Sequence, residues 1–253
     1  MSFRVVIPAR YASSRLPGKP LLDIAGKPMV QHVYERACTC GAESVLVATD
    51  DQRIADTVCS FGGEVCMTSA THPSGTDRLA EVVGIMGYDD EDIIVNMQGD
   101  EPLIPPQLIQ QVAKDLAEFE DASISTICTP IDSIEELFNP NVVKVVMDRL
   151  NYAIYFSRAT IPWHRDAFMV DKENIPAGVQ YHRHLGIYAY RSSFLKRYSR
   201  LEISPLEQIE SLEQLRAIWH GDRIHVSLAA EPPGMGVDTE DDLELVRSVL
   251  LKV

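Results

Sequence analysis

A loop rich in positive charge follows the first predicted strand of the chain. Residues 8–20, PARYASSRLPGKP, carry Arg10, Arg15 and Lys19, and the first twenty residues, which also include Arg4, contain no acidic residue. Arginine holds phosphate oxygens through two parallel hydrogen bonds, and lysine adds a point charge. Ligands of open α/β sheets bind at the carboxyl ends of strands, where this loop lies. We therefore predict a polyphosphate site here; the alternative is a solvated basic loop.

The loop does not match the common phosphate-binding motifs. Neither GxxxxGK[ST] nor GxGxxG is present, and the GxSxG motif of serine hydrolases is absent from the chain. P-loop ATPases, Rossmann dehydrogenases and serine hydrolases therefore lose their main support. Together with separated carboxylates, the loop indicates metal-assisted phosphoryl chemistry without a covalent intermediate.

Two aspartates are candidate metal ligands. Asp100 follows a predicted strand within NMQGDEP, and Asp238 lies 138 residues later (238 − 100) within GMGVDTEDD. Mg²⁺ bound to a nucleotide uses one or two carboxylates together with phosphate oxygens. The alternatives are a turn or capping role for Asp100 and an N-cap of the last helix for Asp238.

Two further stretches are candidates for substrate recognition. Ser74 and Gly75 precede a predicted helix whose free N–H groups would meet a base or a phosphate, with Arg78 in its first turn. Ordinary helix capping is the alternative.

The second stretch, YHRHLGIY, spans residues 181–188, with Arg158 upstream and the pair Glu213–Gln214 downstream. His182 and His184 share one strand face, but no further residue completes a zinc site with them. We expect hydrogen bonding to a polar, acidic substrate, and plain surface positions are the alternative.

The elements that must position these residues alternate between strand and helix, which predicts an α/β fold with a mainly parallel, Rossmann-like sheet. Strands are predicted at 3–8, 44–49, 93–97, 123–130, 142–147, 153–157, 186–191 and 225–230. Helices are predicted at 28–38, 51–61, 76–86, 105–118, 192–200, 205–220 and 239–251. We predict a single domain over 1–253, interrupted at about 140–190 by a smaller antiparallel insertion that serves sugar binding and a subunit contact.

Composition limits the function classes. The chain has 253 residues, 23 Lys+Arg and 37 Asp+Glu, for a net charge of −14. The acidic charge therefore argues against nucleic-acid binding and against association with an anionic membrane. Five cysteines without a Cys-x-x-Cys pair indicate free thiols in a reducing compartment. No leader or membrane span is evident, so we expect a cytoplasmic protein.

Taken together, the motifs resemble those of the 3-deoxy-manno-octulosonate (Kdo) cytidylyltransferases. The ordered set, which spans residues 4–243, comprises IPARYASSRLPGKPL, HPSGTDRLAE, NMQGDEPLI, HLGIYAYR, IESLEQLR and GMGVDTEDDL. The resemblance implies a nucleotidyltransferase fold and the reaction CTP + Kdo → CMP-Kdo + pyrophosphate, which serves lipopolysaccharide assembly. It also implies Mg²⁺ as cofactor and a homodimer.

The resemblance assigns residues to three groups. The catalytic residues it implies are Arg10, Arg15, Lys19, Asp100 and Asp238, of which Asp100 and Asp238 would bind Mg²⁺. The nucleotide-binding residues it implies are Ala9, Arg10, Ser14, Arg15, Lys19, Ser74, Gly75 and Gln98. The sugar-binding residues it implies are Arg78, Arg158, His184, Tyr188, Glu213 and Gln214.

Three alternatives remain at this point. A cytidylyltransferase for another sugar acid, such as sialic acid, would share the architecture. A metal-dependent glycosyltransferase would show an Asp-x-Asp motif, whereas Asp100 and Asp238 are single aspartates in GDE and VDT. A catalytically inactive nucleotide-binding module would not be expected to keep the complete set of charged residues.

Overall fold

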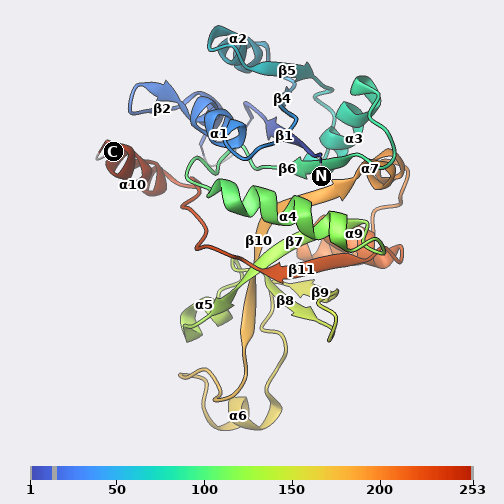
Figure 1. Ribbon diagram of the computed structural model, residues 1–253. Coiled ribbons are helices and arrows are strands. Elements are labelled where there is room, and N and C mark those ends of the chain that lie inside the picture. The colour runs from blue at the N-terminus through green and yellow to red at the C-terminus, as the bar shows by residue number, and fades with distance from the viewer. Residues whose placement is uncertain (1, 13–15, 252–253) are drawn as a thin grey trace.

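The computed structural model describes residues 2–12 and 16–251, and it places helices on both faces of one twisted sheet (Figure 1). In this part of the chain nine strands form the sheet in the order β11-β7-β10-β6-β1-β4-β5, with β8 pairing β10 and β9. These strands are β1 (Arg4–Ala9), β4 (Ser44–Thr49), β5 (Glu64–Met67), β6 (Ile93–Asn96), β7 (Ile124–Ile131), β8 (Lys144–Met147), β9 (Ala153–Ser157), β10 (Tyr181–Arg191) and β11 (Ile224–Leu228). A separate hairpin joins β2 (Asp23–Ile24) and β3 (Lys27–Pro28).

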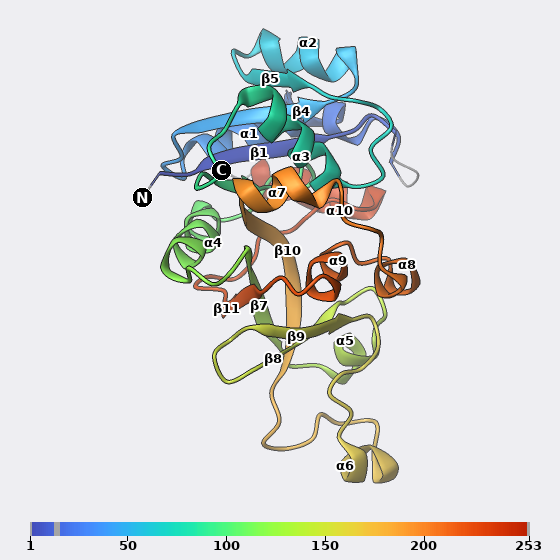
Figure 2. The same cartoon turned by 90° about the vertical axis from the view of Figure 1, so that its right-hand side faces the viewer.

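The helices cover both faces of the sheet and connect its strands. They are α1 (Met29–Cys38), α2 (Gln52–Ser60), α3 (Gly75–Met86), α4 (Pro106–Glu118), α5 (Ile134–Phe138), α6 (Arg165–Val170), α7 (Ser192–Tyr198), α8 (Pro205–Glu210), α9 (Gln214–Trp219) and α10 (Glu240–Leu250), with a 3₁₀ turn, η1, at Lys19–Leu21. Figure 2 shows α4 and α9 on opposite sides of β10.

The consecutive apolar residues of β1 explain its central position. Val5 and Ile7 pack in a core with α1, α2, α4 and α10, whereas Val6 packs in a second core with α3, α7 and α9. All three side chains are fully buried. Successive residues of a strand point to opposite faces, so a run without alternation is what a strand covered on both sides requires.

The sheet is mainly parallel, as predicted, with one long exception. β1 runs parallel to β4 and β6, β4 runs parallel to β5, and β7 runs parallel to β11. β10 lies between β6 and β7 and is antiparallel to both. It begins at Tyr181, five residues before the predicted start, and its first half also pairs with β8. β10 therefore joins the antiparallel part formed by β8 and β9 to the main sheet.

One predicted helix is wrong. The single helix expected at 205–220 is two helices, α8 and α9, with residues 211–213 between them. Ser211 takes the left-handed conformation, with φ of 53°, and its N–H closes the end of α8 by donating to the Glu207 carbonyl. The short elements β2, β3, β5, α5 and α6 were not predicted, because each lies in a stretch too short or too polar to show a period.

The segment between β9 and β10 carries α6 to the end of the molecule opposite α2 (Figure 2). Met169 and Val170 on α6 are 77% and 89% exposed. Among the described residues no helix has both the length and the apolar character needed to cross a membrane.

Candidate active site

Two neighbouring cavities open where the loops after β1 and β6 meet the N-terminus of α3. The smaller, of about 380 Å³, is lined by every predicted nucleotide-binding residue within the described part of the chain. These are Ala9, Arg10, Lys19, Ser74, Gly75 and Gln98, and Asp100 lines the cavity as well. Ser14 and Arg15, which were also predicted here, lie outside the described residues.

The close approach of two strand ends shapes this nucleotide-side cavity. β1 and β6 are adjacent and parallel, so their carboxyl ends lie side by side. A Cβ atom on Gly99 would lie 2.8 Å from the Pro8 carbonyl oxygen, which is too short for a contact between a side-chain carbon and a backbone oxygen. Glycine at this position therefore lets the loop after β6 lie against the end of β1.

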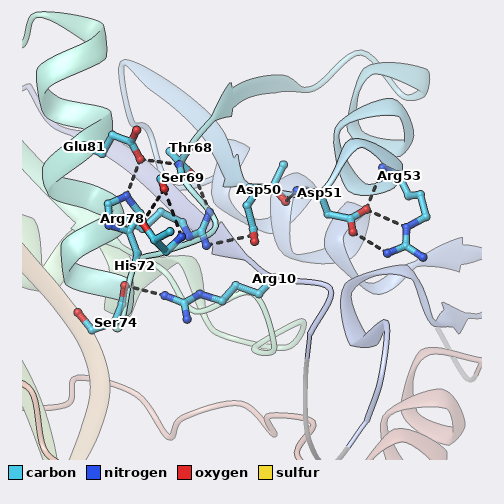
Figure 3. Close-up of polar contacts among 12 residues, drawn as sticks. Arg10, Asp50, Asp51, Arg53, Thr68, Ser69, His72, Ser74, Arg78 and Glu81 are labelled. Carbon is cyan, nitrogen blue, oxygen red and sulfur yellow. Dashed lines mark hydrogen bonds and ion pairs between the residues drawn. The ribbon is translucent and has the colours of Figure 1, made fainter.

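Arg10 connects the loop after β1 to the start of α3. One of its guanidinium nitrogens donates to the Ser74 carbonyl at 2.9 Å (Figure 3). The Ser74 hydroxyl accepts from the Asp77 N–H at 3.1 Å and thereby caps α3. The positive end of the helix and a guanidinium thus converge on one cavity, which is an arrangement suited to phosphate.

Lys19 brings the two candidate metal ligands together. Its Nζ donates to Asp100 Oδ2 at 2.8 Å, to Asp238 Oδ1 at 3.2 Å and to the Val237 carbonyl at 2.7 Å. The two segments are also joined through their backbones, because the Val237 N–H donates to the Asp100 carbonyl at 2.9 Å. The N-cap of α10 is Thr239, whose partner is Asp242, so the alternative capping role of Asp238 is wrong.

This donor set suits Mg²⁺ held together with a nucleotide. Asp100 and Asp238 retain 36% and 52% exposed side chains, so their oxygens are accessible. Within residues 2–12 and 16–251 no group of three or more His, Cys, Asp or Glu side chains forms a closed metal cage. Mg²⁺ commonly takes one or two carboxylates and completes its shell with phosphate oxygens and water. The two aspartates fit that role.

Glu101 lies beside the same pair. Burial raises the pKa of the Glu101 carboxyl to about 7, and the charges of Asp100 and Asp238 act in the same direction. Its carboxyl lies against Gly236, where a Cβ atom would be 2.9 Å from Glu101 Oε1. Like charges that share a low-dielectric site cannot all ionise freely.

The larger cavity, of about 650 Å³, adjoins the first and shares Pro73, Ser74 and Gln98 with it. Four of the predicted sugar-binding residues line it, namely His184, Tyr188, Glu213 and Gln214. They come from β10 and from the start of α9, which both line the cavity.

Burial shifts three titratable groups of this second cavity toward their neutral forms. Burial lowers the pKa of His184 to about 3 and raises that of Tyr188 well above its usual range. Burial also raises the pKa of Glu213, whose Oε2 lies 3.5 Å from the Thr76 N–H. The Nε2 atom of Gln214 is buried with no hydrogen-bond partner among the described residues, so this residue of the lining carries an unpaired donor.

The hydrogen bonds of Thr126 indicate the tautomer of His184. The Thr126 hydroxyl donates to the Ile187 carbonyl at 2.7 Å and lies 3.0 Å from His184 Nε2. Because the single hydroxyl proton is used on the carbonyl, the histidine Nε2–H must donate to the threonine oxygen. Nδ1 is then left as an acceptor.

Comparisons with known proteins identify the family of this chain. The family model described as cytidylyltransferase matches residues 4–224. A Vibrio vulnificus protein (strain YJ016) named 3-deoxy-manno-octulosonate cytidylyltransferase is 60% identical over 250 residues, covering 99% of this chain and 98% of the relative. An Idiomarina loihiensis protein of the same name is 57% identical, covering 98% of each chain. This chain belongs to the 3-deoxy-manno-octulosonate cytidylyltransferase family.

Two solved structures share the fold of this chain. A structure described as CMP:2-keto-3-deoxy-manno-octonic acid synthetase complexed with CTP has a TM-score of 0.89 and 45% identity, covering 100% of this chain and 99% of that one. A cytidylyltransferase from Leptospira borgpetersenii shares the fold at 17% identity and a TM-score of 0.63, and the match covers 100% of this chain and 88% of that one. The nucleotidyltransferase fold expected from the motifs is confirmed.

Arg78 does not lie where the family resemblance placed it. Its side chain is completely buried, forms an ion pair with Asp50 at 3.0 Å and donates to the Thr68 hydroxyl (Figure 3). It lines neither cavity. The expectation of a direct sugar contact is therefore wrong for Arg78, because a buried guanidinium paired beneath the strand ends cannot meet a ligand in the cavity.

Arg158 lies behind the larger cavity rather than on its lining. Its Nε donates to the Glu210 carbonyl at 2.7 Å and its Nη1 to the Pro140 carbonyl at 3.0 Å. A direct sugar contact of Arg158 stays a prediction; in this arrangement its guanidinium connects two segments of the cavity wall.

Sequence reasoning missed several residues of the larger cavity. Arg183, Asn141, Glu207 and Gln208 line it, and Glu207 is held by Arg216 through contacts of 2.6 and 2.8 Å. Arg183 lies between His182 and His184 in the YHRHLGIY stretch, so the sequence motif itself could have indicated it. The other three carry no local mark, because only the folding of the turn before β8 and of α8 around β10 brings them to the site.

Proposed function

We propose that this chain transfers CMP from CTP to the anomeric hydroxyl of Kdo and releases pyrophosphate. The single observation that carries the proposal is the pair of joined cavities. One holds Arg10, Lys19 and the capped start of α3 beside two aspartates, and the other is lined by hydrogen-bonding groups that include His184, Tyr188 and Gln214. The relatives named for this reaction support the choice of substrates.

In this proposal the smaller cavity binds the nucleotide. Arg10 would bind triphosphate oxygens near the positive end of α3, and Lys19 would neutralise charge on the same groups. Ser74, Gly75 and Gln98 would lie beside the cytidine, near the boundary of the two cavities. Ser14 and Arg15 are proposed nucleotide contacts on the family resemblance alone.

Asp100 and Asp238 would hold Mg²⁺ together with the phosphates. When bound, the ion supplies Lewis-acid stabilisation of charge that develops on the phosphoryl oxygens. Lys19 lies between the two carboxylates, so we expect its ammonium to move toward the phosphates when the nucleotide arrives.

The larger cavity would bind Kdo through hydrogen bonds. His184 Nδ1 would accept from a sugar hydroxyl, the Gln214 amide would donate to an oxygen, and the protonated Tyr188 phenol would donate as well. The anomeric hydroxyl would then face the α-phosphorus across the Ser74–Gln98 boundary. Holding both reactants in this geometry converts an encounter of two anions into an oriented, in-line displacement.

The protruding α6 segment would serve a subunit contact. Trp163, Met169 and Val170 expose 49%, 77% and 89% of their surface there. Exposed apolar groups gathered on one projection are typical of an interface. We propose a homodimer formed through this segment, acting in the cytoplasm in lipopolysaccharide biosynthesis without nucleic acid or stable membrane association.

Pyrophosphate release tests the function directly. We expect release from CTP only when Kdo is present and Mg²⁺ is supplied. N-acetylneuraminate, assayed side by side, should give a far lower rate. Equal rates with the two sugar acids, or no release with Kdo, would contradict the proposal. Measuring the mass of the protein in solution by light scattering tests the dimer separately.

A further inference from the structure

A buried lysine behind the larger cavity has no part in the proposed chemistry. Lys144 is the first residue of β8 and is completely buried. Its Nζ donates to the carbonyl oxygens of Asn139 at 2.9 Å, Val142 at 2.6 Å and Arg158 at 2.7 Å. All three donors of the ammonium group are thus used on main-chain oxygens, which is a demanding way to hold a buried charge.

The acceptors of Lys144 belong to two segments of the cavity region. Asn139 and Val142 flank the turn that leads into β8, and Asn141, Val142 and Val143 of this turn line the larger cavity. Arg158 lies at the end of β9 and donates through Nη1 to the Pro140 carbonyl in the same turn. Lys144 and Arg158 together therefore hold three carbonyls of one cavity wall.

The same group extends to the opposite wall. The Glu210 carboxylate accepts from the Arg158 N–H at 2.9 Å and from the Ser157 hydroxyl at 2.6 Å, and the Glu210 carbonyl accepts from Arg158 Nε at 2.7 Å. Glu210 ends α8, and the residues that follow it, Ser211 to Gln214, line the cavity. Arg158 is therefore bonded on one side to Lys144 and on the other to the start of the second wall.

The charges of this group are consistent with a fixed structural role. Burial lowers the pKa of Lys144, and the negative charge of Glu210 opposes that shift. The ammonium has no carboxylate at hydrogen-bond distance among the described residues, so its geometry is set by the three carbonyls. Removing it would leave these buried oxygens without donors and release the turn 139–142.

We propose that Lys144 is a positioning residue that sets the width of the sugar cavity by holding its two walls together through Arg158. The inference rests on the proposed function, because it assigns the larger cavity to Kdo. It predicts that loss of Lys144 weakens Kdo binding selectively, since the smaller cavity is built from the ends of β1 and β6 and the start of α3 and does not touch this group.

The test compares Lys144→Met with a matched control, Arg191→Met. Arg191 is also a basic side chain bonded to main-chain carbonyls, those of Ala122 and Leu116 at 2.9 Å, but it lines neither cavity. We expect Lys144→Met to raise the KM for Kdo about tenfold while the KM for CTP changes by less than about twofold. Arg191→Met should lower the Tm without changing either KM.

Two results would overturn the proposal. One is a KM for Kdo in Lys144→Met that stays within about twofold of the wild-type value. The other is a rise of the KM for Kdo and of the KM for CTP by the same factor in Lys144→Met and in Arg191→Met alike. If Lys144→Met does not fold, Glu210→Gln decides the question, because this partly exposed residue fixes the other side of Arg158 and the same Kdo-selective rise is expected. A wild-type enzyme that releases no pyrophosphate from CTP and Kdo would instead refute the proposed function.

Discussion

The two cavities of the candidate site differ in the state of their polar groups. The nucleotide-side cavity is lined by Arg10 and Lys19 beside the partly exposed carboxylates of Asp100 and Asp238. In the sugar-side cavity, burial favours the neutral forms of His184, Tyr188 and Glu213. The first is suited to act on phosphates through charge, and the second to bind a sugar through oriented hydrogen bonds.

This difference has a physical origin in the position of each cavity. The nucleotide side lies at exposed strand ends, where charged groups keep their hydration. On the sugar side, His184, Tyr188 and Glu213 are buried between β10 and the α8–α9 connection, where an unpaired charge is unfavourable. A sugar acid that enters the second cavity carries its own negative charge, so the neutral forms of Tyr188 and Glu213 avoid repulsion while retaining hydrogen bonds.

The largest expected effect tests the charged cavity. Asp100→Asn keeps the shape of the side chain but removes the charge that would hold Mg²⁺, so we expect kcat to fall about 100-fold or more. Steady-state pyrophosphate release measures this, and the Tm checks the fold. Asp121→Asn, at an exposed aspartate paired with Arg223, is the matched control and should keep wild-type turnover. Near-wild-type turnover of Asp100→Asn in saturating Mg²⁺ would show that the reaction does not depend on the charge of Asp100.

A smaller effect tests the sugar-side cavity. The raised pKa of Glu213 means that its carboxylate forms only as the pH rises above the ordinary range of a glutamate. The ionised form would repel anionic Kdo, so the wild-type KM for Kdo should rise with pH by up to about tenfold. In Glu213→Gln this part of the rise should be absent. Dividing the wild-type KM for Kdo by the KM of Glu213→Gln at each pH cancels the titration of CTP itself. A ratio that stays constant with pH would show that Glu213 carries no pH-dependent repulsion.

The smallest effect concerns Glu101, which lies beside Asp100 and Asp238. The pKa of Glu101 is raised to about 7, above its unfolded value, so the folded state favours the protonated form. Its contribution to stability is full below the unfolded pKa and is lost as the pH rises through about 7. Glu101→Gln should therefore raise the Tm of the ligand-free protein at pH 8 by about 2–4 °C, with the difference shrinking toward pH 5.

The control for this measurement is Glu118→Gln, whose carboxylate is 57% exposed on α4 and forms an i,i+4 pair with Lys114. It should change the Tm little at either pH. A Tm for Glu101→Gln at or below that of the wild type at pH 8 would contradict the raised pKa.

Local sequence patterns predicted most of the architecture correctly. The consecutive apolar residues of β1, β4 and β6 require a strand buried on both faces, and that requirement depends on the residues themselves. The start of α3 at Ser74 likewise follows from a hydroxyl next to the first free N–H groups. The order of the motifs along the chain was also sufficient to indicate the family.

Only the tertiary structure decided which residues meet. Lys19 lies 219 positions from Asp238 and contacts it because η1 and the segment before α10 arrive at the same strand end. Arg78 stands in a motif shared with the candidate site, yet its side chain points inward to Asp50. The left-handed Ser211 divides a continuous helical pattern into α8 and α9.

The physical reason is the range of each interaction. Burial periodicity and capping act within a few residues, so a single sequence records them. The pairing of charges across the fold depends on which strand ends and loops are brought together, and on whether a side chain faces a cavity or the core. The packing of the whole chain decides these contacts. The sequence alone determined the strands, helices and caps, but not which distant residues contact one another.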